Sequence, residues 1–436
     1  IYRICEYLGI ADKVHLRDVD DDCTDSLYFA EDQTTYHIKK GKEGFVSSLA
    51  EHFPEERANL EAYVDAVHRL TDEVDLFYLR PSNDFFPVHS EEFNLAADAF
   101  IAKYIQNPKL RNVVAYMNPL YGGVADATPA YVHAIVSVLY MQGASRFVGG
   151  SDRFAQLLVS VIESAGGEVR CNEGAEWVEV NNRHVDYVRS TKGNEYRADH
   201  YISAIHPCTL LPLLSEKAFP KAYRTRLNDI PNAYSAFSVY VKLKLETFPY
   251  INHSEYYMTR YDKVWHFGEH HDTWPLGFLF MTPPEDNQGK YADKALITAP
   301  MIFEEVEKWA QTTVGRRGKD YELWKKEQAE RLLERIEEIH PGFNACVDKV
   351  NTASPLTIRD YYGAKEGTMC GFCKDYKNTV LSQLPVVTKV DNLLLTGQYN
   401  NLPGFCGVPL TAINTVEAIL GRNCVIRRLT PNHDQA

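Results

Sequence analysis

The feature that most constrains the fold is one stretch near the C-terminal end of the chain, residues 393–420. It opens with the apolar run Leu393-Leu394-Leu395 and passes through three glycines and two prolines into an amphipathic segment. An apolar strand that leads through a glycine turn into a helix is how many α/β proteins bind a cofactor, because the helix N-terminus offers free N–H groups and partial positive charge. The turn carries no lysine and the chain contains no G-x-G-x-x-G, so a P-loop and the usual dinucleotide fingerprint are both missing. On these residues alone, a strand-to-helix turn without a ligand is an equal alternative.

A second region with α/β patterns lies between residues 145 and 210. Residues 151–164 place apolar side chains on one helix face, which predicts a buried stripe, with Ser151 as the cap and Gly166-Gly167 at the end. This stripe consists of Phe154, Leu157, Leu158, Val161 and Ile162. Strand candidates follow at 168–171, 176–180, 184–190 and 200–205. For the helix near the C-terminus, the predicted buried stripe is Ile413, Val416, Ile419 and Leu420.

The remaining segments have a different character. Apolar spacing predicts helices at 45–53, 60–70, 94–106 and 130–141. Residues 234–301 are rich in aromatic and β-branched side chains, which indicates a second, β-rich layer. Residues 321–339 predict a charged helix with Leu332, Leu333 and Ile336 on its inner side. Because this block separates the two α/β regions, we expect one domain to be assembled from separated segments of chain.

Composition excludes several classes of function. The 436 residues are 45% apolar and 24% charged, as in an ordinary globular protein of two or three domains. The net charge of -13 disfavours nucleic acid and offers no general attraction to anionic lipid. Nine scattered cysteines match no disulfide framework, which favours a reducing, cytoplasmic compartment. No apolar run is long enough to predict a transmembrane helix.

Three further motifs carry weaker signals. Cys370 and Cys373 have thioredoxin-like spacing, but no helical pattern follows them, so a structural role is favoured over a redox pair. Residues 266–272, HFGEHHD, offer metal-ligand types in a strand-like context, and a polar turn is favoured over a metal site. Cys406 lies inside the glycine turn with no histidine nearby in sequence to activate it. We therefore predict no metal and assign no catalytic residue.

Several longer stretches, taken in order, resemble one family. Residues 140–180, 197–207, 353–372 and 392–419 resemble the flavin-dependent phytoene desaturase, carotenoid isomerase and retinol saturase family, part of the wider flavin amine oxidase fold. Residues 116–136 and 354–372 look most similar to the retinol saturase and carotenoid isomerase branch. The resemblance runs from about residue 1 to residue 421 and is carried by the combination of stretches rather than by any one motif.

The fold implied by this resemblance is an α/β protein with two domains. It combines an FAD-binding Rossmann-like domain, built from discontinuous segments, with an α+β substrate domain that holds an apolar cavity. Residues 145–210 and 345–436 would supply the FAD-binding domain, and residues 1–144 and 211–344 the two parts of the substrate domain. This division agrees with the separated α/β regions found above.

The resemblance implies FAD as the cofactor, with NAD(P) as a candidate electron donor or acceptor. Its cofactor contacts can be transferred to matching residues of this chain. Ala175, where the family usually has valine, would face the adenine through its backbone. Ser203 and Ala204, at the end of a predicted strand, would lie near the adenine and the pyrophosphate.

The same family pattern assigns the flavin side of the site to the C-terminal stretch. Gly397 and Gln398 would lie at the pyrophosphate and the ribityl chain, with Gln in place of the acidic residue of many relatives. Gly407 and Val408, expected to open the last helix, would lie at the flavin ring. A helix N-terminus there would stabilise negative charge on the reduced flavin. The glycine fingerprint and the ribose-binding acidic residue would precede Ile1, so we expect the chain to be a fragment that binds FAD poorly or not at all.

The function implied is FAD-dependent desaturation, saturation or isomerisation of a polyene or isoprenoid, such as a carotenoid or retinoid. Such an apolar substrate has no acidic proton, so no general base is required. One alternative is a flavin amine oxidase, with Tyr362 and Tyr399 as candidates for an aromatic pair at the flavin. Another is a remnant that has lost FAD and enzymatic activity. A lipid substrate also implies peripheral membrane contact, through residues 75–87 or 246–257, although core packing is the favoured explanation for those aromatic residues.

Overall fold

The computed structural model describes residues 1–82, 88–286, 289–379 and 383–430. The helices are α1 (Tyr2–Tyr7), α2 (Lys42–Ala50), α3 (Arg57–Asp72), α4 (Ala97–Tyr104), α5 (Pro108–Val114), α6 (Ala130–Met141), α7 (Ser151–Ser164), α8 (Pro207–Leu210), α9 (Lys221–Asp229), α10 (Lys319–Ile339), α11 (Phe343–Cys346), α12 (Pro355–Tyr362), α14 (Gly404–Leu420) and α15 (Cys424–Leu429). The strands are β1 (Leu16–Asp18), β2 (Asp25–Phe29), β3 (Thr34–Ile38), β4 (Ser145–Phe147), β5 (Ala175–Asn181), β6 (His184–Ser190), β7 (Glu195–Tyr196), β8 (Tyr201–Ser203), β9 (Ser235–Leu243), β10 (Ser254–Met258), β11 (Gly277–Met281), β12 (Lys294–Met301), β13 (Val347–Ala353) and β14 (Leu393–Leu395).

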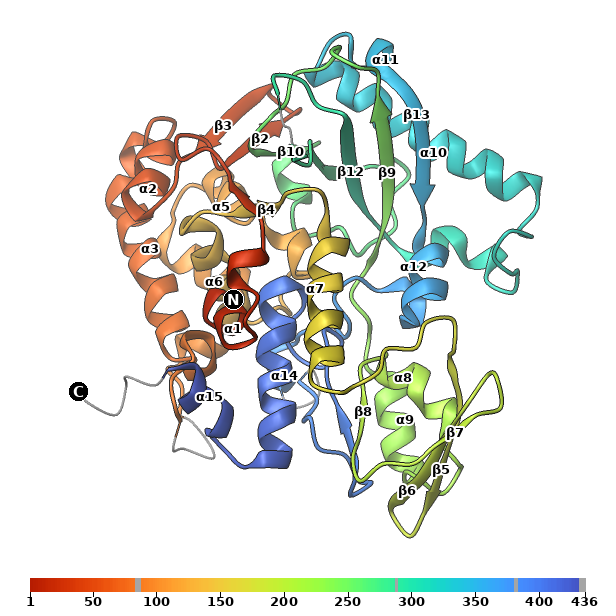
Figure 1. Cartoon of the computed structure of the whole chain (residues 1–436). Helices are drawn as coiled ribbons and strands as arrows, with labels where there is room; N and C mark the ends of the chain where they lie inside the picture. Colours follow the sequence, from red (N-terminus) through yellow and green to blue (C-terminus); the bar gives the residue numbers. More distant parts are fainter. Residues whose placement is uncertain (83–87, 287–288, 380–382, 431–436) are drawn as a thin grey trace.

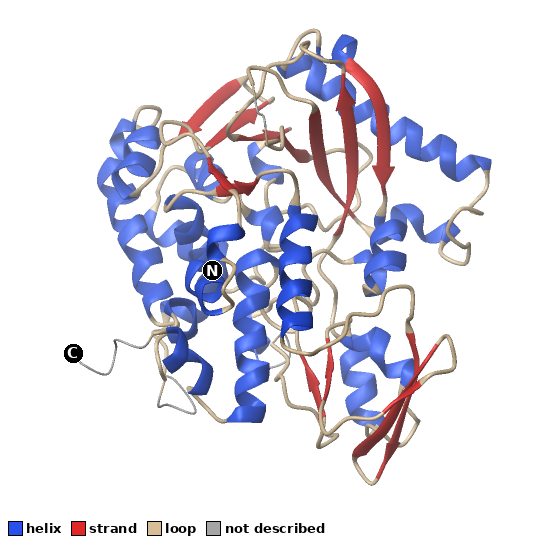
Figure 2. Ribbon diagram, viewed as in Figure 1, coloured by secondary structure: helices blue, strands red, loops and turns tan. Residues whose placement is uncertain are grey.

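The largest sheet joins distant parts of the chain. Its strand order is β13-β9-β12-β11-β10-β2-β3, and its only parallel pair among the described strands is β10 with β2, in which Tyr256 lies opposite Leu27. This pairing connects residues near the N-terminus to residues beyond 250, and Figures 1 and 2 show the two sets of strands in one layer.

Helices cover both faces of this sheet. Tyr256 and Met258 of β10 pack into a core with α3 and α6, whereas the intervening Tyr257 packs into a second core with Leu332 and Ile336 of α10. This alternation follows from the period of two in a strand. The prediction of a β-rich layer and of a charged helix with an apolar inner side is confirmed.

A second, smaller unit contains the stretch on which the sequence argument began. β14 and β8 form a parallel pair, and the backbone N–H of Thr396 donates to the carbonyl of Ser203 at 2.9 Å just beyond it. A separate three-stranded sheet, β5-β6-β7, follows α7 in the chain. The first turns of α7 and α14 meet where Phe154 and Phe405 lie with ring centroids 4.9 Å apart, and the two helices run side by side in Figure 1.

The α/β fold class is confirmed, and so is the existence of most predicted elements, but several local expectations are wrong. Residues 168–171 form no strand, because no neighbouring strand in the described chain offers them hydrogen-bond partners. Ser151 is the first residue of α7 rather than its cap, and α7 contains no buried residue although its apolar stripe is present. Phe154, Leu157, Leu158 and Val161 are half-buried and Ile162 is exposed, so amphipathic spacing predicted the inward face of the helix but not full burial.

The start and inner face of α14 also differ from the expectation. The helix begins at Gly404, three residues before Gly407, with Pro403 at the cap position. Of the predicted buried stripe, Ile413 is buried, whereas Val416 and Leu420 are exposed. Thr411 and Thr415 are buried instead, because Thr415 donates its hydroxyl to the carbonyl of Leu395 and faces the strand pair.

The predicted domain division stays a prediction, but its segments can be placed in the fold. Residues 25–38 and 235–301 share the largest sheet, as two parts of one domain would. β13, which falls within the C-terminal segment 345–436 of that division, also pairs with β9 in the same sheet. β14 and β8, from the two segments assigned to FAD, pair with each other.

Candidate functional site

A cavity of about 270 Å³ lies between the largest sheet and the turn that precedes α14; we call it the turn cavity. The turn contributes Gln398, Pro403 and Gly404 to its wall. The lining side chains are mostly apolar, and none of the described ones is acidic. The full lining is Pro119, Leu120, Tyr234, Ser235, Ala236, Tyr256, Met258, Phe278, Leu279, Thr298, Pro300, Met369, Cys370, Gln398, Pro403 and Gly404.

Backbone geometry explains two of the glycines in this turn. Gly397 has φ +90°, and a side chain there would approach the carbonyl oxygen of Ala204 to 3.2 Å. Gly404 has φ +79°, and nothing lies within 4 Å of the position that a Cβ would take. Both conformations favour glycine. The first N–H groups of α14 therefore start from an open, exposed position beside the cavity.

Two buried polar side chains in the same turn have no hydrogen-bond partner among the described residues. They are the hydroxyl of Thr396 and both amide atoms of Asn400, whose side chain is 0% exposed. A buried unpaired polar group costs about 1–3 kcal/mol, so it is uncommon in a folded protein unless something else satisfies it. These atoms therefore indicate that a polar group belongs next to the turn.

The structure brings together four of the residues to which cofactor contacts are assigned. Ser203 ends β8, and Ala204 follows it directly beside Gly397. Gln398 lies at the cavity, where its amide nitrogen donates to the carbonyl of Met369 at 3.2 Å. Ala175 lies apart from them, exposed at the start of β5 in the three-stranded sheet. No observation tests whether any of these residues contacts FAD, so the assignments stay predictions.

The sequence predicted that Gly407 and Val408 open α14, and this prediction is wrong. The two residues lie one turn inside the helix, which begins at Gly404. A Cβ on Gly407 would meet the carbonyl oxygen of Leu402 at 2.4 Å, so the close approach of the turn backbone requires glycine here. Packing within the protein thus explains this glycine without a cofactor. The residue of α14 with open space beside it is Gly404.

The polar side chains of the turn cavity are nearly all engaged within the protein. Tyr234 donates to the side-chain oxygen of Asn118 at 3.2 Å, and Ser235 donates to the carbonyl of Gly367 at 2.5 Å. The Thr298 hydroxyl is bonded to that of Ser238 at 3.0 Å, and the Cys370 thiol donates to the carbonyl of Leu120 at 3.7 Å. The remaining hydroxyl, that of Tyr256, has no hydrogen bond to any described residue.

A buried carboxyl group lies behind that tyrosine. Asp25 at the start of β2 is almost completely buried, and Tyr116 donates to its Oδ2 at 2.9 Å. The ring of Tyr116 meets the ring of Tyr256 edge-on at 5.1 Å between centroids. Burial raises the pKa of Asp25 to about 6, although the hydrogen bond from Tyr116 and the charge of Arg146 oppose that shift. The sequence analysis assigned no role in the site to Asp25 or Tyr256, because a single Asp or Tyr in a strand belongs to no motif.

The Cys370 and Cys373 thiols lack the environment of a redox pair. Burial raises the pKa of Cys370 to about 12 and that of Cys373 to about 11. A reactive thiol requires the opposite shift. Burial also lowers the pKa of the neighbouring Lys374 to about 8. These observations favour the structural explanation of this motif.

The histidine-rich stretch at 266–272 is held by hydrogen bonds between its histidines and carboxylate groups. His266 Nδ1 lies 2.6 Å from Glu269, and His270 Nδ1 lies 2.9 Å from Glu305. No group of three His, Cys, Asp or Glu side chains suited to a metal ion occurs within the part of the chain that the structure describes.

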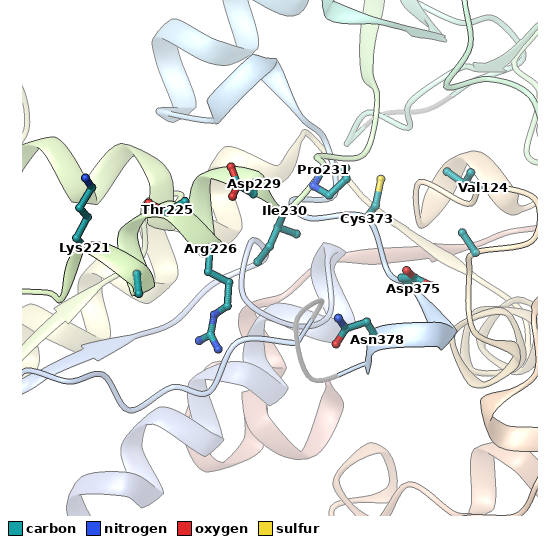
Figure 3. Close-up of a pocket in the computed structure, with 12 residues that line it drawn as sticks. Val124, Lys221, Thr225, Arg226, Asp229, Ile230, Pro231, Cys373, Asp375 and Asn378 are labelled. Carbon is teal, nitrogen blue, oxygen red and sulfur yellow. The ribbon is translucent and has the colours of Figure 1, made fainter.

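A second, larger pocket of about 930 Å³ is shown in Figure 3; we call it the outer pocket. One face of α9 contributes Lys221, Ala222, Thr225, Arg226 and Asp229 to it. Three stretches of chain, 119–127, 230–236 and 369–378, contribute residues to both spaces. Residues 119–120, 234–236 and 369–370 face the turn cavity, whereas 124–127, 230–231 and 373–378 supply residues to the outer pocket. The same stretches of chain therefore contribute to both spaces, although the two share no lining residue.

The two segments considered for membrane contact are placed differently. In 246–257, Phe248, Tyr256 and Tyr257 are buried in the cores of the protein, so core packing accounts for them. In 75–87, the side chains of 76–78 are partly exposed, and 83–87 lie outside the described residues. Over the described ranges, no helix has both the length and the apolar character needed to cross a bilayer.

A parallel strand pair, a glycine turn and an open helix N-terminus beside an apolar cavity are typical of a cofactor-binding α/β protein. The chain belongs to the family described as flavin containing amine oxidoreductase, whose family model matches residues 1–413. It is therefore a flavin-dependent oxidoreductase, and the family resemblance found in the sequence is confirmed.

Individual relatives are more distant. All-trans-retinol 13,14-reductase from Rattus norvegicus is 25% identical over 431 residues, which cover 89% of this chain and 70% of the relative. An oxidoreductase from Methanosarcina mazei has a TM-score of 0.61 at 14% identity, covering 95% of this chain and 85% of that one. Cyclohexylamine oxidase from Brevibacterium oxydans has a TM-score of 0.57 at 13% identity, covering 97% and 84%. The two structural similarities show a shared fold alone.

The residues of the turn fit the flavin nucleotide that the family implies. The unpaired amide of Asn400 and hydroxyl of Thr396 suit a polar ligand, and the open backbone at Gly404 gives a ligand access to the first N–H groups of α14. The apolar cavity on the inner side suits a reacting ring and its substrate. No observation bears on NAD(P), which stays a prediction.

Proposed function

We propose that this protein, with FAD bound, carries out oxidation–reduction of a polyene or isoprenoid of the retinoid type, with saturation of a C=C bond as the first candidate reaction. The observation that carries the proposal is the turn cavity, which places an apolar, largely buried wall directly against the turn at Pro403 and Gly404. The similarity to a retinol reductase over most of the chain supports the substrate class. Desaturation and cis/trans isomerisation remain within the proposal, because they need the same apolar site.

Bound FAD would accept or donate a hydride, while the protein would bind, orient and shield the substrate. The rings and aliphatic side chains of Phe278, Leu279 and Met258 provide an apolar surface for a conjugated chain. Thr396, Gln398 and Asn400 would hold the cofactor, and the N-terminus of α14 would stabilise negative charge on it. Exclusion of water from the cavity would prevent side reactions of the reduced state.

The outer pocket extends this proposal to the length of the substrate. At about 270 Å³, the turn cavity lies at the lower end of ligand-binding volumes, which are about 300–1,000 Å³. It would hold the reacting part of a long polyene. The outer pocket, with Ala222, Ile230 and Pro231 in its wall, would hold the remainder. Peripheral membrane contact through 75–82 is kept as a proposal for substrate delivery, supported by the partly exposed apolar side chains there.

A flavin amine oxidase is the second candidate, because the fold is shared with cyclohexylamine oxidase. The site supports it less well. No described residue of the turn cavity is acidic, so the cavity offers an ammonium group no counter-charge. The candidate aromatic pair is also not formed in the cavity. Tyr362 is 64% exposed, Tyr399 is buried against His206, and neither lines the cavity.

The deciding experiment compares two substrate classes on the FAD-loaded full-length gene product. Reduced enzyme is mixed anaerobically with all-trans-retinol, and oxidised enzyme with cyclohexylamine, while the flavin absorbance is followed. The proposal expects flavin reoxidation by retinol with a product two mass units heavier, and no flavin reduction by the amine. Flavin reduction by the amine together with no reaction of retinol would overturn the assignment in favour of an amine oxidase.

A further inference from the structure

The proposed saturation requires a proton as well as a hydride, and neither the sequence nor the family match indicates where the proton comes from. The turn cavity offers few candidates. Its polar side chains are Tyr234, Ser235, Tyr256, Thr298, Cys370 and Gln398. Five of these hydrogen-bond to other parts of the protein, as described above.

Tyr256 is the exception among the described lining residues. It is 3% exposed, it lines the cavity, and its hydroxyl has no hydrogen bond within the described chain. It lies in the middle of β10, a central strand of the largest sheet, between β11 and β2. A side chain on a paired strand is held more precisely than one on a loop, which suits a group that must meet a bound substrate.

The surroundings of Tyr256 contain one buried acid. Asp25 begins β2, the parallel neighbour of β10, and is 3% exposed. Its charge acts on three tyrosines around it: Tyr116, Tyr140 and Tyr256. Burial first, and the negative charge of Asp25 second, raise the pKa of Tyr256 well above its usual value. Neutralising Asp25 would therefore make the Tyr256 hydroxyl a stronger acid.

Among the described residues, the groups that act on this carboxyl group come from several elements. Tyr116 comes from the segment after α5, Tyr140 from α6 and Arg146 from β4, while Thr24, His253 and Tyr256 come from β2, β10 and their flanking residues. The contacts are the hydrogen bonds from Tyr116 at 2.9 Å and Thr24 at 3.5 Å, and the charges of Arg146 and His253. Cys23 lies close enough for the charge of Asp25 to raise its pKa, after burial.

We infer that Tyr256 is the proton donor of the turn cavity, and that Asp25 is a positioning residue that sets its acidity through its own charge. The inference rests on the proposed saturation reaction. In that reaction, the proton of Tyr256 Oη would add to one carbon of the C=C bond, and reduced FAD, when bound, would supply the hydride for the other. The π bond would be replaced by two C–H bonds with FAD left oxidised, and the phenolate would regain its proton from water.

The catalytic arm of the test uses FAD-loaded Tyr256→Phe and a matched control, Tyr257→Phe. Tyr257 is the next residue of β10 and points to the opposite face of the sheet, into the core with α10. Single-turnover saturation of all-trans-retinol by the reduced enzyme is expected to slow at least 100-fold in Tyr256→Phe, the lower end of general acid catalysis. The control and the retinol affinity of both variants should change less than threefold. Saturation by Tyr256→Phe within threefold of the wild-type rate would overturn the inference.

The second arm needs no turnover, so it separates this inference from the proposed reaction. Tyrosines are labelled with ¹³C at Cζ, and the Tyr256 resonance is assigned from its loss in Tyr256→Phe. Retinol binding should shift that resonance, and Asp25→Asn should move its titration to lower pH. If neither occurs, the inference is wrong whatever the enzyme does; if both occur in a protein that fails to saturate retinol, the inference about Tyr256 stands and the reaction assignment fails.

The pH profile provides the readout specific to Asp25. Ionisation of Asp25 makes Tyr256 a weaker acid, so the wild-type saturation rate should fall as pH rises through about 6. Asp25→Asn carries no charge at any pH and should lack that fall. If the rate of Asp25→Asn falls with pH in the same way as that of the wild type, Asp25 is not the source of the fall.

Discussion

At the scale of single residues, the least expected feature is a set of polar side chains buried without partners of their own. Asn400 shows this most clearly, since both atoms of its amide are unpaired within the described chain. Asp25 is different, because it has a hydrogen-bond donor but no counter-ion in contact. Burial of either side chain costs folding free energy, and residues with such a cost are typical of functional sites.

Replacing Asn400 by leucine should separate folding from cofactor binding. Removing an unpaired buried amide is nearly neutral or stabilising for the protein without FAD, because no hydrogen bond is lost. FAD affinity should fall about tenfold, which corresponds to about 1.4 kcal/mol for a lost hydrogen bond. FAD fluorescence quenching measures the affinity, with the neighbouring Asn401→Leu as the control. Unchanged affinity in Asn400→Leu would remove this side chain from the cofactor site.

The buried Asp25 predicts a pH dependence of stability. Its folded pKa of about 6 lies above the ordinary value of 3.8, so the folded state binds the proton more tightly than the unfolded state. The resulting stabilisation is complete below about pH 4 and is lost as pH rises through about 6. Between those limits it amounts to about 3 kcal/mol, at about 1.4 kcal/mol per pKa unit.

Urea unfolding of Asp25→Asn at a series of pH values measures this effect. Relative to wild type, the variant should gain about 3 kcal/mol of unfolding free energy on going from pH 4 to pH 7, because it never buries a charge. The exposed Asp22→Asn is the control and should show no such gain. A constant difference between Asp25→Asn and wild type across this range would contradict the raised pKa.

At the scale of elements, the turn before α14 shows what sequence patterns could and could not predict. The apolar run 393–395, the glycines and the helix were all predicted and are present. The role of Gly407 was not, because the close approach of the Leu402 carbonyl depends on how the turn folds back. The stripe on α7 was predicted as buried and is only half-buried, since burial depends on the neighbouring elements rather than on the spacing. Tyr256 and Asp25 were missed because they meet only when β10 and β2, about 230 residues apart, pair in one sheet.

The packing role of Gly407 can be tested without any cofactor. Gly407→Ala would bring a Cβ to 2.4 Å from the Leu402 carbonyl oxygen, so the turn or the helix must shift. We expect a loss of about 1–3 kcal/mol in unfolding free energy, as for other overpacked sites. Gly174→Ala is the matched control, because its added Cβ would meet only a methyl group at the ordinary distance of 3.7 Å. Equal stability of the two variants would mean that α14 does not depend on this close approach.

Helix α9 provides a test of the outer pocket as an extension of the substrate site. Thr225→Trp places a large ring on the face of α9 that lines the pocket. Affinity for a long polyene such as β-carotene should fall about tenfold, while a short isoprenoid alcohol such as geraniol should bind unchanged. Asn228→Trp, at an exposed position of the same helix that does not line the pocket, controls for surface effects. Equal losses for long and short ligands, or no loss for either, would contradict a substrate role for this pocket.

At the scale of the whole molecule, two parts of the fold contribute different walls of the turn cavity. The largest sheet supplies a precisely held wall, including Tyr256, and the β14–α14 unit supplies the turn with its open helix N-terminus. The turn cavity exists only where these two parts meet. The turn is one continuous stretch of sequence, so the sequence could indicate the cofactor. The cavity wall from the largest sheet combines strands that are distant in sequence, so it could be identified only in the folded protein.

The central claim is that this molecule binds a flavin beside an apolar cavity and uses it on a polyene. The most direct measurement is the absorbance spectrum of the full-length gene product with FAD, recorded before and after all-trans-retinol is added anaerobically to the reduced protein. The account predicts one bound flavin, which returns to its oxidised spectrum as retinol is saturated. A protein that binds no flavin, or a bound and reduced flavin that retinol leaves unchanged, would contradict it.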